Sequence, residues 1–293
     1  MKKILLFISI LIVVVMACDL SVTVVPTNPA PLATDIMISA SETSTSVPAS
    51  ATPIPSTVAD VQVSVGPLTI TLPHGLATGV RGNRFPRAEG SDVAPWGVTP
   101  GHTELKLEGY LLQAKTHEPR ILIYPAQAYG EMCPVAFENM NRLSNMLGGL
   151  QVTSHQLPAV PFFSAQQVFA SNIQLVSFQN GRGVRFLTEY AQYAVSANNS
   201  DLFYQFQGFT DDGAYYVIAI LPITVPLLAE TSDGGAVLPA GGVPYPYFAE
   251  GIDADMEEYY HSVTDLLNAA SPQSFTPTIG QLDQLIQSML IVP

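Results

Sequence analysis

The chain has 293 residues, 47% of them hydrophobic, and a formal net charge of −13 at pH 7. This acidic balance argues against two classes of partner, nucleic acid and anionic lipid headgroups, because both carry negative charge. The chain has two cysteines, Cys18 and Cys133.

The first residues are typical of a secretory signal peptide. Lys2 and Lys3 precede an apolar stretch from Ile4 to Ala17 that only Ser9 interrupts. A helix over residues 4–17 would be about 21 Å long. The hydrocarbon core of a bilayer is thicker, about 30 Å. The segment therefore predicts a signal peptide over residues 1–17 that is exported and cleaved, rather than a membrane-spanning helix.

The residues at the end of this stretch, Val15-Met16-Ala17-Cys18, resemble the lipobox of bacterial lipoproteins. The resemblance covers residues 1–18. It implies cleavage before Cys18, a diacylglyceryl thioether on its sulfur, and a palmitate-bearing protein on the extracytoplasmic face of a cell membrane, at the cell surface or in the periplasm. Two acyl chains give stable attachment where one is marginal. The alternative is that Cys18 is one more apolar residue of a signal peptide cut elsewhere.

Residues 18–57 have the composition of a disordered tether. Prolines recur among serine, threonine and alanine, at Pro26, Pro29, Pro31, Pro48, Pro53 and Pro55. Such a segment has too little apolar side chain to form a core. A flexible chain of this length spans about 35 Å, enough to hold a domain away from a membrane. Residues 58–293 then form a single domain, which their number suits.

The first half of this domain contains several strand patterns. Residues 61–72 predict a strand pair or one bent strand, and residues 120–124 predict a short apolar strand. Residues 104–113 alternate, with Leu105, Leu107 and Leu111 facing one way.

The clearest pattern is an antiparallel meander of four strands over residues 166–223. Three turn sequences, at residues 180–183, 198–201 and 210–213, separate its strands. The last strand, residues 215–221, is apolar on both faces and should be covered on both. Arg185 and Glu189 fall on one face of a strand and are expected to form an exposed ion pair.

About three helices are expected to cover the sheet. The first starts at Pro134 and ends at Gly148-Gly149, and the second starts near Asp255 with Glu258 as the partner in a capping box. The third opens with Thr276-Pro277 and buries Ile279, Leu282, Ile286, Met289 and Leu290. Strands and helices without strict alternation predict an α+β fold. By element order, a sheet with a late helix laid over it resembles the PsbP/Mog1 type of fold.

Two Pro/Gly-rich segments, residues 81–102 and 229–251, are expected to be long loops with a functional role. Their arginines and aromatic side chains would cup a glycan or another anionic ligand if the loops meet. The alternative is that the aromatic rings lie over the sheet edge as lids. The candidate ligand-binding residues are Arg81, Arg84, Arg87, Trp96, Tyr245, Tyr247 and Phe248.

A cluster of four acids is a weaker candidate for a metal site. Clustered oxygens suit calcium, but the spacing of an EF-hand is absent, and acids at a helix start also complement the helix dipole. The residues concerned are Asp253, Asp255, Glu257 and Glu258. No resident metal or cofactor is expected.

No catalytic motif is present, and the histidines, His74, His102, His117, His155 and His261, are scattered. Cys133 precedes a predicted helix, where a thiolate is stabilised, but a buried structural cysteine is the favoured interpretation. We therefore expect a binding or accessory module of the cell envelope whose partner is a glycan, a protein or a small molecule. An exported hydrolase acting on envelope or extracellular polymer, and a structural envelope protein, are the alternatives.

Overall fold

The computed structural model describes residues 60–149, 157–246 and 256–292, whose strands form two antiparallel sheets. The larger sheet has seven strands in the order β3-β4-β5-β9-β8-β7-β6. Their bounds are β3 Gly79–Phe85, β4 His102–Glu108, β5 Arg120–Pro125, β6 Gln166–Phe178, β7 Gly181–Ala191, β8 Phe203–Thr210 and β9 Tyr215–Pro222. The smaller sheet has the order β1-β2-β10, with β1 Val61–Val65, β2 Leu68–Leu72 and β10 Leu290–Ile291. With its helices, the protein is α+β.

Four α-helices lie in the described part of the chain, one more than the sequence predicted. They are α1 Ala126–Met132, α2 Pro134–Leu147, α3 Met256–Ala269 and α4 Ile279–Gln287. Two short 3-10 helices, η1 Pro95–Gly97 and η3 Pro272–Ser274, lie in loops. No helix in the described ranges is long and apolar enough to span a membrane.

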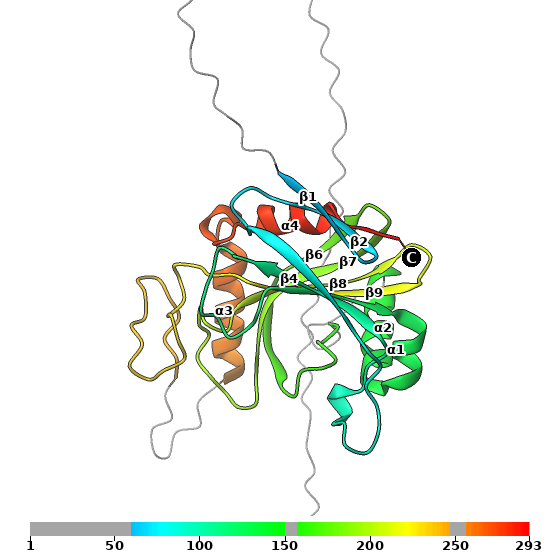
Figure 1. Ribbon diagram of the computed structural model, residues 1–293. Helices are drawn as coiled ribbons and strands as arrows, with labels where there is room; N and C mark the ends of the chain where they lie inside the picture. The colour runs from blue at the N-terminus through cyan, green and yellow to red at the C-terminus, as the bar shows by residue number, and fades with distance from the viewer. Residues whose placement is uncertain (1–59, 150–156, 247–255, 293) are drawn as a thin grey trace, which may run out of the picture.

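The large sheet is the middle of three layers (Figure 1). One face packs against the small sheet, α3 and α4, in a core that includes Leu187, Phe206 and Val217. The other face packs against α1 and α2, in a core that includes Phe186 and Ile218. Because β9 lies in the middle of the sheet, both of its faces are buried, as its continuous apolar sequence predicted.

The predicted helix boundaries hold for α2 and need correction for α4. Pro134 occupies the first turn of α2, and Gly148 caps the other end. The cap of α4 is Thr278, whose side chain forms a capping box with Gln281, so this helix begins later than predicted. Leu290 follows the helix and belongs to β10.

The predicted exposed ion pair between Arg185 and Glu189 is wrong. Both side chains are buried, at 6% and 1% exposure, beneath the layer that holds α3 and α4. Arg185 pairs instead with Asp283 of α4, with its Nε 3.2 Å from Oδ1. The backbone N–H of Asn198 donates to Glu189 at 2.8 Å. Spacing along a strand had identified their shared face correctly, but it carries no information about what covers that face.

Candidate functional site

A groove opens at one end of the large sheet, beneath the turn between β1 and β2. We call it the end groove; its cavity measures about 880 Å³. It is lined by Gly66, Pro67, Arg84, Phe85, Pro86, Gly101, His102, Thr103, Ile123, Pro125 and Tyr215. This volume lies within the range of small-molecule sites.

Strand register brings the side chains of the groove floor together. Arg84 of β3 is opposite Thr103 of β4, which is opposite Ile123 of β5. Pro125 lies two residues beyond Ile123 on β5 and pairs with Tyr215 of the next strand, β9. With strands about 4.8 Å apart, the floor from β3 to β9 is about 14 Å wide. An elongated ligand can therefore contact Arg84 at one end and Tyr215 at the other.

The β1–β2 turn forms the roof of the end groove. Gly66 has a φ of +57°, a left-handed conformation that favours glycine. A Cβ at this position would lie 3.5 Å from the methyl group of Thr103, in ordinary contact. The turn therefore sits directly above Thr103.

Arg84 differs from most cations of this protein. Among the described lysines and arginines, only Arg84 and Arg182 have no carboxylate oxygen within 4.0 Å. No carboxylate lines the end groove either. The guanidinium of Arg84 thus has up to five N–H donors and no acidic side chain to receive them.

Two hydroxyl groups add to this set of donors. The hydroxyls of Thr103 and Tyr215 make no hydrogen bond with the described part of the protein, although both residues line the groove. Each can donate one hydrogen bond to a ligand. The floor therefore presents a fixed positive charge and two hydroxyls between apolar surfaces, which suits an anionic ligand with an apolar or sugar-like body.

His102 borders the groove, but its imidazole lies on the other face of β4 from Thr103, on the side of the α1 and α2 core. Its Nδ1 lies 3.0 Å from the carbonyl oxygen of Pro100 and therefore carries the proton, which leaves Nε2 as an acceptor. Burial lowers the pKa of His102 and outweighs the hydrogen bond to Pro100 and the charge of Glu104, both of which raise it. The ring stacks between Phe85, at 5.4 Å, and Tyr124, at 4.5 Å. The stacking holds the imidazole on the face of the sheet that α1 and α2 cover.

The other arginines of the first predicted loop lie outside the end groove. Arg81 lies with Arg84 on strand β3, not in a loop, and pairs with Glu108. Arg87 pairs with Glu89. Trp96 lies in η1 and is 47% exposed.

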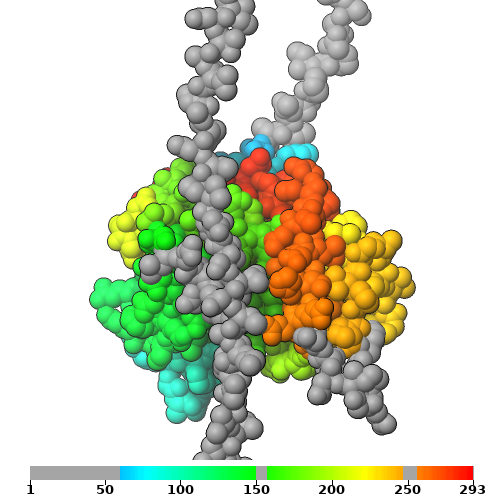
Figure 2. Space-filling model, turned by 180° about the vertical axis from the view of Figure 1, so that it is seen from behind, coloured from blue at the N-terminus to red at the C-terminus, as the bar shows by residue number. Residues whose placement is uncertain are grey.

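The second predicted loop lies on another side of the molecule, beside α3 (Figures 1 and 2). Tyr245 is half-buried there; its hydroxyl donates to the carbonyl of Ala194 at 3.1 Å, and its ring meets Tyr259 edge-on at 5.2 Å. Tyr245 thus packs against α3 and the segment that follows β7. Tyr247 and Phe248 lie outside the described residues. The described parts of the two segments therefore do not form one shared cup.

Of the acid cluster, Asp253 and Asp255 lie outside the described residues. Glu257 and Glu258 occupy the first turn of α3, where carboxylates complement the helix dipole. Within the described ranges, no group of three or more potential metal ligands occurs. Cys133 is a free thiol, 1% exposed, at the junction of α1 and α2.

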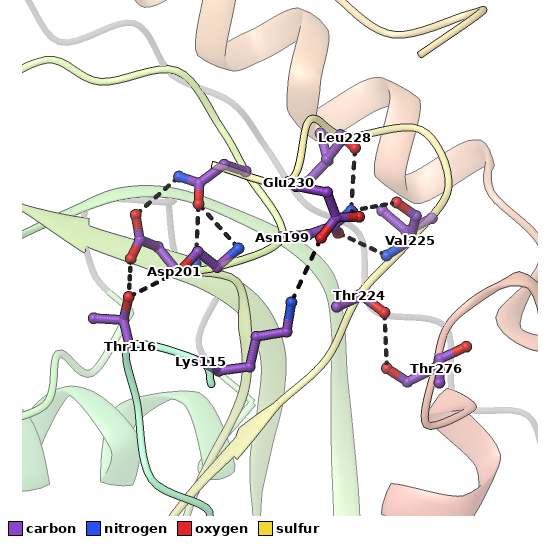
Figure 3. A network of polar contacts seen from close by, with 11 residues as sticks. Lys115, Thr116, Asn199, Asp201, Thr224, Val225, Leu228, Glu230 and Thr276 are labelled. Atoms are coloured by element: carbon purple, nitrogen blue, oxygen red, sulfur yellow. Dashed lines mark hydrogen bonds and ion pairs between the residues drawn. The ribbon is translucent and has the colours of Figure 1, made fainter. Parts of the chain in front are cut away.

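A polar network occupies the opposite end of the strands (Figure 3). The side-chain amide of Asn199 donates to the carbonyls of Val225, at 3.0 Å, and Leu228, at 3.1 Å, and its oxygen accepts from the N–H of Val225 at 2.9 Å. Beside it, Lys115 lies 3.7 Å from Glu230. Because these groups satisfy one another, the network fixes the loops at this end and leaves few donors for a ligand. The end groove, at the other end of the strands, is therefore the better candidate for a ligand site.

Neither a protein-family model, nor a curated protein, nor a solved structure matches this chain. The resemblance to the PsbP/Mog1 type of fold thus stays a prediction from element order.

Proposed function

We propose that this chain is a lipid-anchored extracytoplasmic protein of the bacterial cell envelope, and that its domain is a binding module for an anionic ligand held in the end groove. The observation that carries the binding proposal is Arg84, a cation without an acidic partner in a groove without a carboxylate. The lipobox-like sequence ending at Cys18 and the proline-rich residues 18–57 support the anchor and the tether.

The end groove favours an anion for a physical reason. A charge-assisted hydrogen bond from a guanidinium is about twice as strong as a neutral one, and it is strongest where apolar walls displace water. The chain as a whole is acidic, with a formal net charge of −13, and repels polyanions in general. A ligand must therefore fit the groove to overcome that repulsion, which favours selective binding of one small anion or of one acidic end of a glycan.

Binding is favoured over the two alternative functions. Hydrolysis of a polymer commonly uses a pair of carboxylates or a nucleophile with a base. No thiol or carboxylate lines the end groove, and the imidazole of His102 stacks on Tyr124 at the other face of the sheet. A purely structural role would not explain why the side-chain donors of Arg84, Thr103 and Tyr215 face a groove and have no partner in the described part of the protein.

Arg84→Ala is expected to weaken ligand binding by about 10- to 100-fold, because a hydrogen bond to a charged group contributes about 1.5–3 kcal/mol. The probes are glucuronate oligosaccharides, citrate and pyrophosphate, each titrated by calorimetry. Arg81→Ala is the matched control, since Arg81 lies on the same strand but outside the groove. It should change the affinity less than about twofold.

Two results would contradict the binding proposal. One is that none of the three probes binds at millimolar concentration. The other is that a probe binds with the same affinity to the Arg84→Ala variant as to the unchanged protein.

Cys18→Ser is expected to abolish labelling by radioactive palmitate and to leave an uncut precursor or a protein released from the membrane, because serine has no thiol to carry the thioether. Cys133→Ala is the matched control and should keep the label, since Cys133 is buried in the fold. The measurement is autoradiography of membrane and soluble fractions. Label that persists in the Cys18→Ser variant would refute the anchor without affecting the groove.

A further inference from the structure

A second groove lies on the other face of the large sheet, between α1, α2 and the turns at the ends of β7 and β8. We call it the helix groove, and its cavity measures about 970 Å³. It shares no lining residue with the end groove. An inference drawn from it therefore goes beyond the proposed function and does not depend on it.

The helix groove has an apolar strip beside polar side chains of α1, α2 and the β8–β9 turn. Phe137, Met140 and Leu147 of α2 and Phe209 of β8 line it, and Phe137 is 55% exposed. Gly130 of α1 makes this close packing possible, because a Cβ there would lie 3.0 Å from the terminal methyl group of Met140. A large aromatic ring left open to water beside a cavity of this size favours an apolar ligand.

Arg182 supplies the charge at one side of the groove. Arg182 lies on β7 directly opposite Phe209 of β8, so its side chain leaves the backbone next to an aromatic ring that lines the groove. It is the second of the two described cations that have no carboxylate within 4.0 Å. Two acids, Glu131 and Asp211, line the same groove, and neither carboxylate lies within ion-pair distance of Arg182. The donors of Arg182 are thus available to a ligand.

We propose that the helix groove binds a single-chain amphiphile with an anionic head group. The apolar chain lies along Phe137, Met140 and Phe209, and the head group accepts hydrogen bonds from Arg182. An apolar ligand alone would gain nothing from the exposed guanidinium of Arg182, and a cationic head group beside it would place like charges together. One anionic head on one chain satisfies both parts of the groove.

The test uses the chain from residue 18 onward with Cys18→Ser and ¹³C-labelled methionine methyl groups. Decanoate, decanol and decyltrimethylammonium are titrated separately below their micelle concentrations. Decanoate should bind most tightly and shift the methyl resonance of Met140. The resonance of Met289, buried in the other core, should not move.

Two variants make the test specific. Arg182→Ala should weaken decanoate binding at least tenfold and leave decanol binding unchanged, and Ser144→Trp should block both by filling the groove, which Ser144 lines. Arg84→Ala should have no effect, so failure here and failure of the end groove are distinguishable. Preference for the cationic amphiphile, decanoate binding that survives Arg182→Ala, or a Met140 resonance that no probe shifts would each overturn the proposal.

Discussion

Arg185→Ala is expected to lower the free energy of unfolding by about 3–5 kcal/mol, the usual cost of removing one partner of a buried ion pair. Arg185 contacts two elements, α4 and β6. Its Nε lies 3.2 Å from Asp283 of α4, its Nη2 donates to Gln174 at 2.5 Å, and its Nη1 donates to the carbonyl of Asn172. Asn172 lies in a bulge of β6 with a φ of +52°. Alanine would leave that carbonyl and the carboxylate of Asp283 without the cation that compensates their burial.

The measurement is urea unfolding followed by circular dichroism. Arg182→Ala is the matched control, because Arg182 lies on the same strand, is exposed and has no ion pair; its effect should be within about 0.5 kcal/mol. The double variant Arg185→Met with Asp283→Leu should recover most of the loss, since it removes both charges and keeps the volume. A loss below about 1 kcal/mol in Arg185→Ala would show that water reaches the pair.

The elements that the sequence predicted best are those with a local signal. Pro134 at the start of α2 and Gly148 at its end act through their own backbone preferences, which do not depend on distant contacts. The continuous apolar run of β9 is also a local signal, and it predicts burial on both faces of the strand. Periodicity and turn residues are properties of short segments, so they can be recognised without knowledge of distant contacts.

The elements that the sequence did not predict depend on tertiary contacts. Helix α1 has only seven residues and no side-chain cap, so it has little local signal, and its packing against α2 stabilises it. Strand β3 has the sequence Gly-Val-Arg-Gly-Asn-Arg-Phe, which is poor in strand-forming residues. It forms because it pairs with β4 along its whole length.

The candidate site shows the same limit. Arg84 was among the predicted ligand-binding residues because arginine is scarce in this chain, and that signal is local. Thr103 and Tyr215 join it only through the order and register of four strands, which no pattern around either residue reveals. The convergence expected between the two long loops depended on the path of the chain in space, and the described parts of the loops lie apart (Figure 1).

Glu189→Gln is expected to make the protein more stable at neutral pH and to change how its stability depends on pH. Glu189 is 1% exposed, and no lysine or arginine of the described chain lies within ion-pair distance of it. Burial raises the pKa of its carboxyl well above the ordinary value of 4.5, and the hydrogen bond from Asn198 only partly opposes this effect. The nearby charge of Asp201 raises the pKa further. The native protein therefore holds Glu189 protonated at pH values where the unfolded chain has released the proton.

The sign of the effect follows from this difference in bound protons. Below pH 4.5 both states hold the proton, and Glu189 has no effect on the pH dependence of unfolding. As the pH rises above 4.5, the unfolded chain is favoured by up to about 1.4 kcal/mol per pH unit, until the native carboxyl also loses its proton. Glutamine has no proton to lose and resembles the protonated acid in shape. In urea unfolding between pH 4 and pH 7, the gain in stability of Glu189→Gln over the unchanged protein should therefore grow as the pH rises above 4.5. Glu257→Gln, at an exposed position of α3, should give a curve parallel to that of the unchanged protein. A constant difference between Glu189→Gln and the unchanged protein over this range would mean that Glu189 is ionised in the native state, and that water or a cation reaches the core beneath α3.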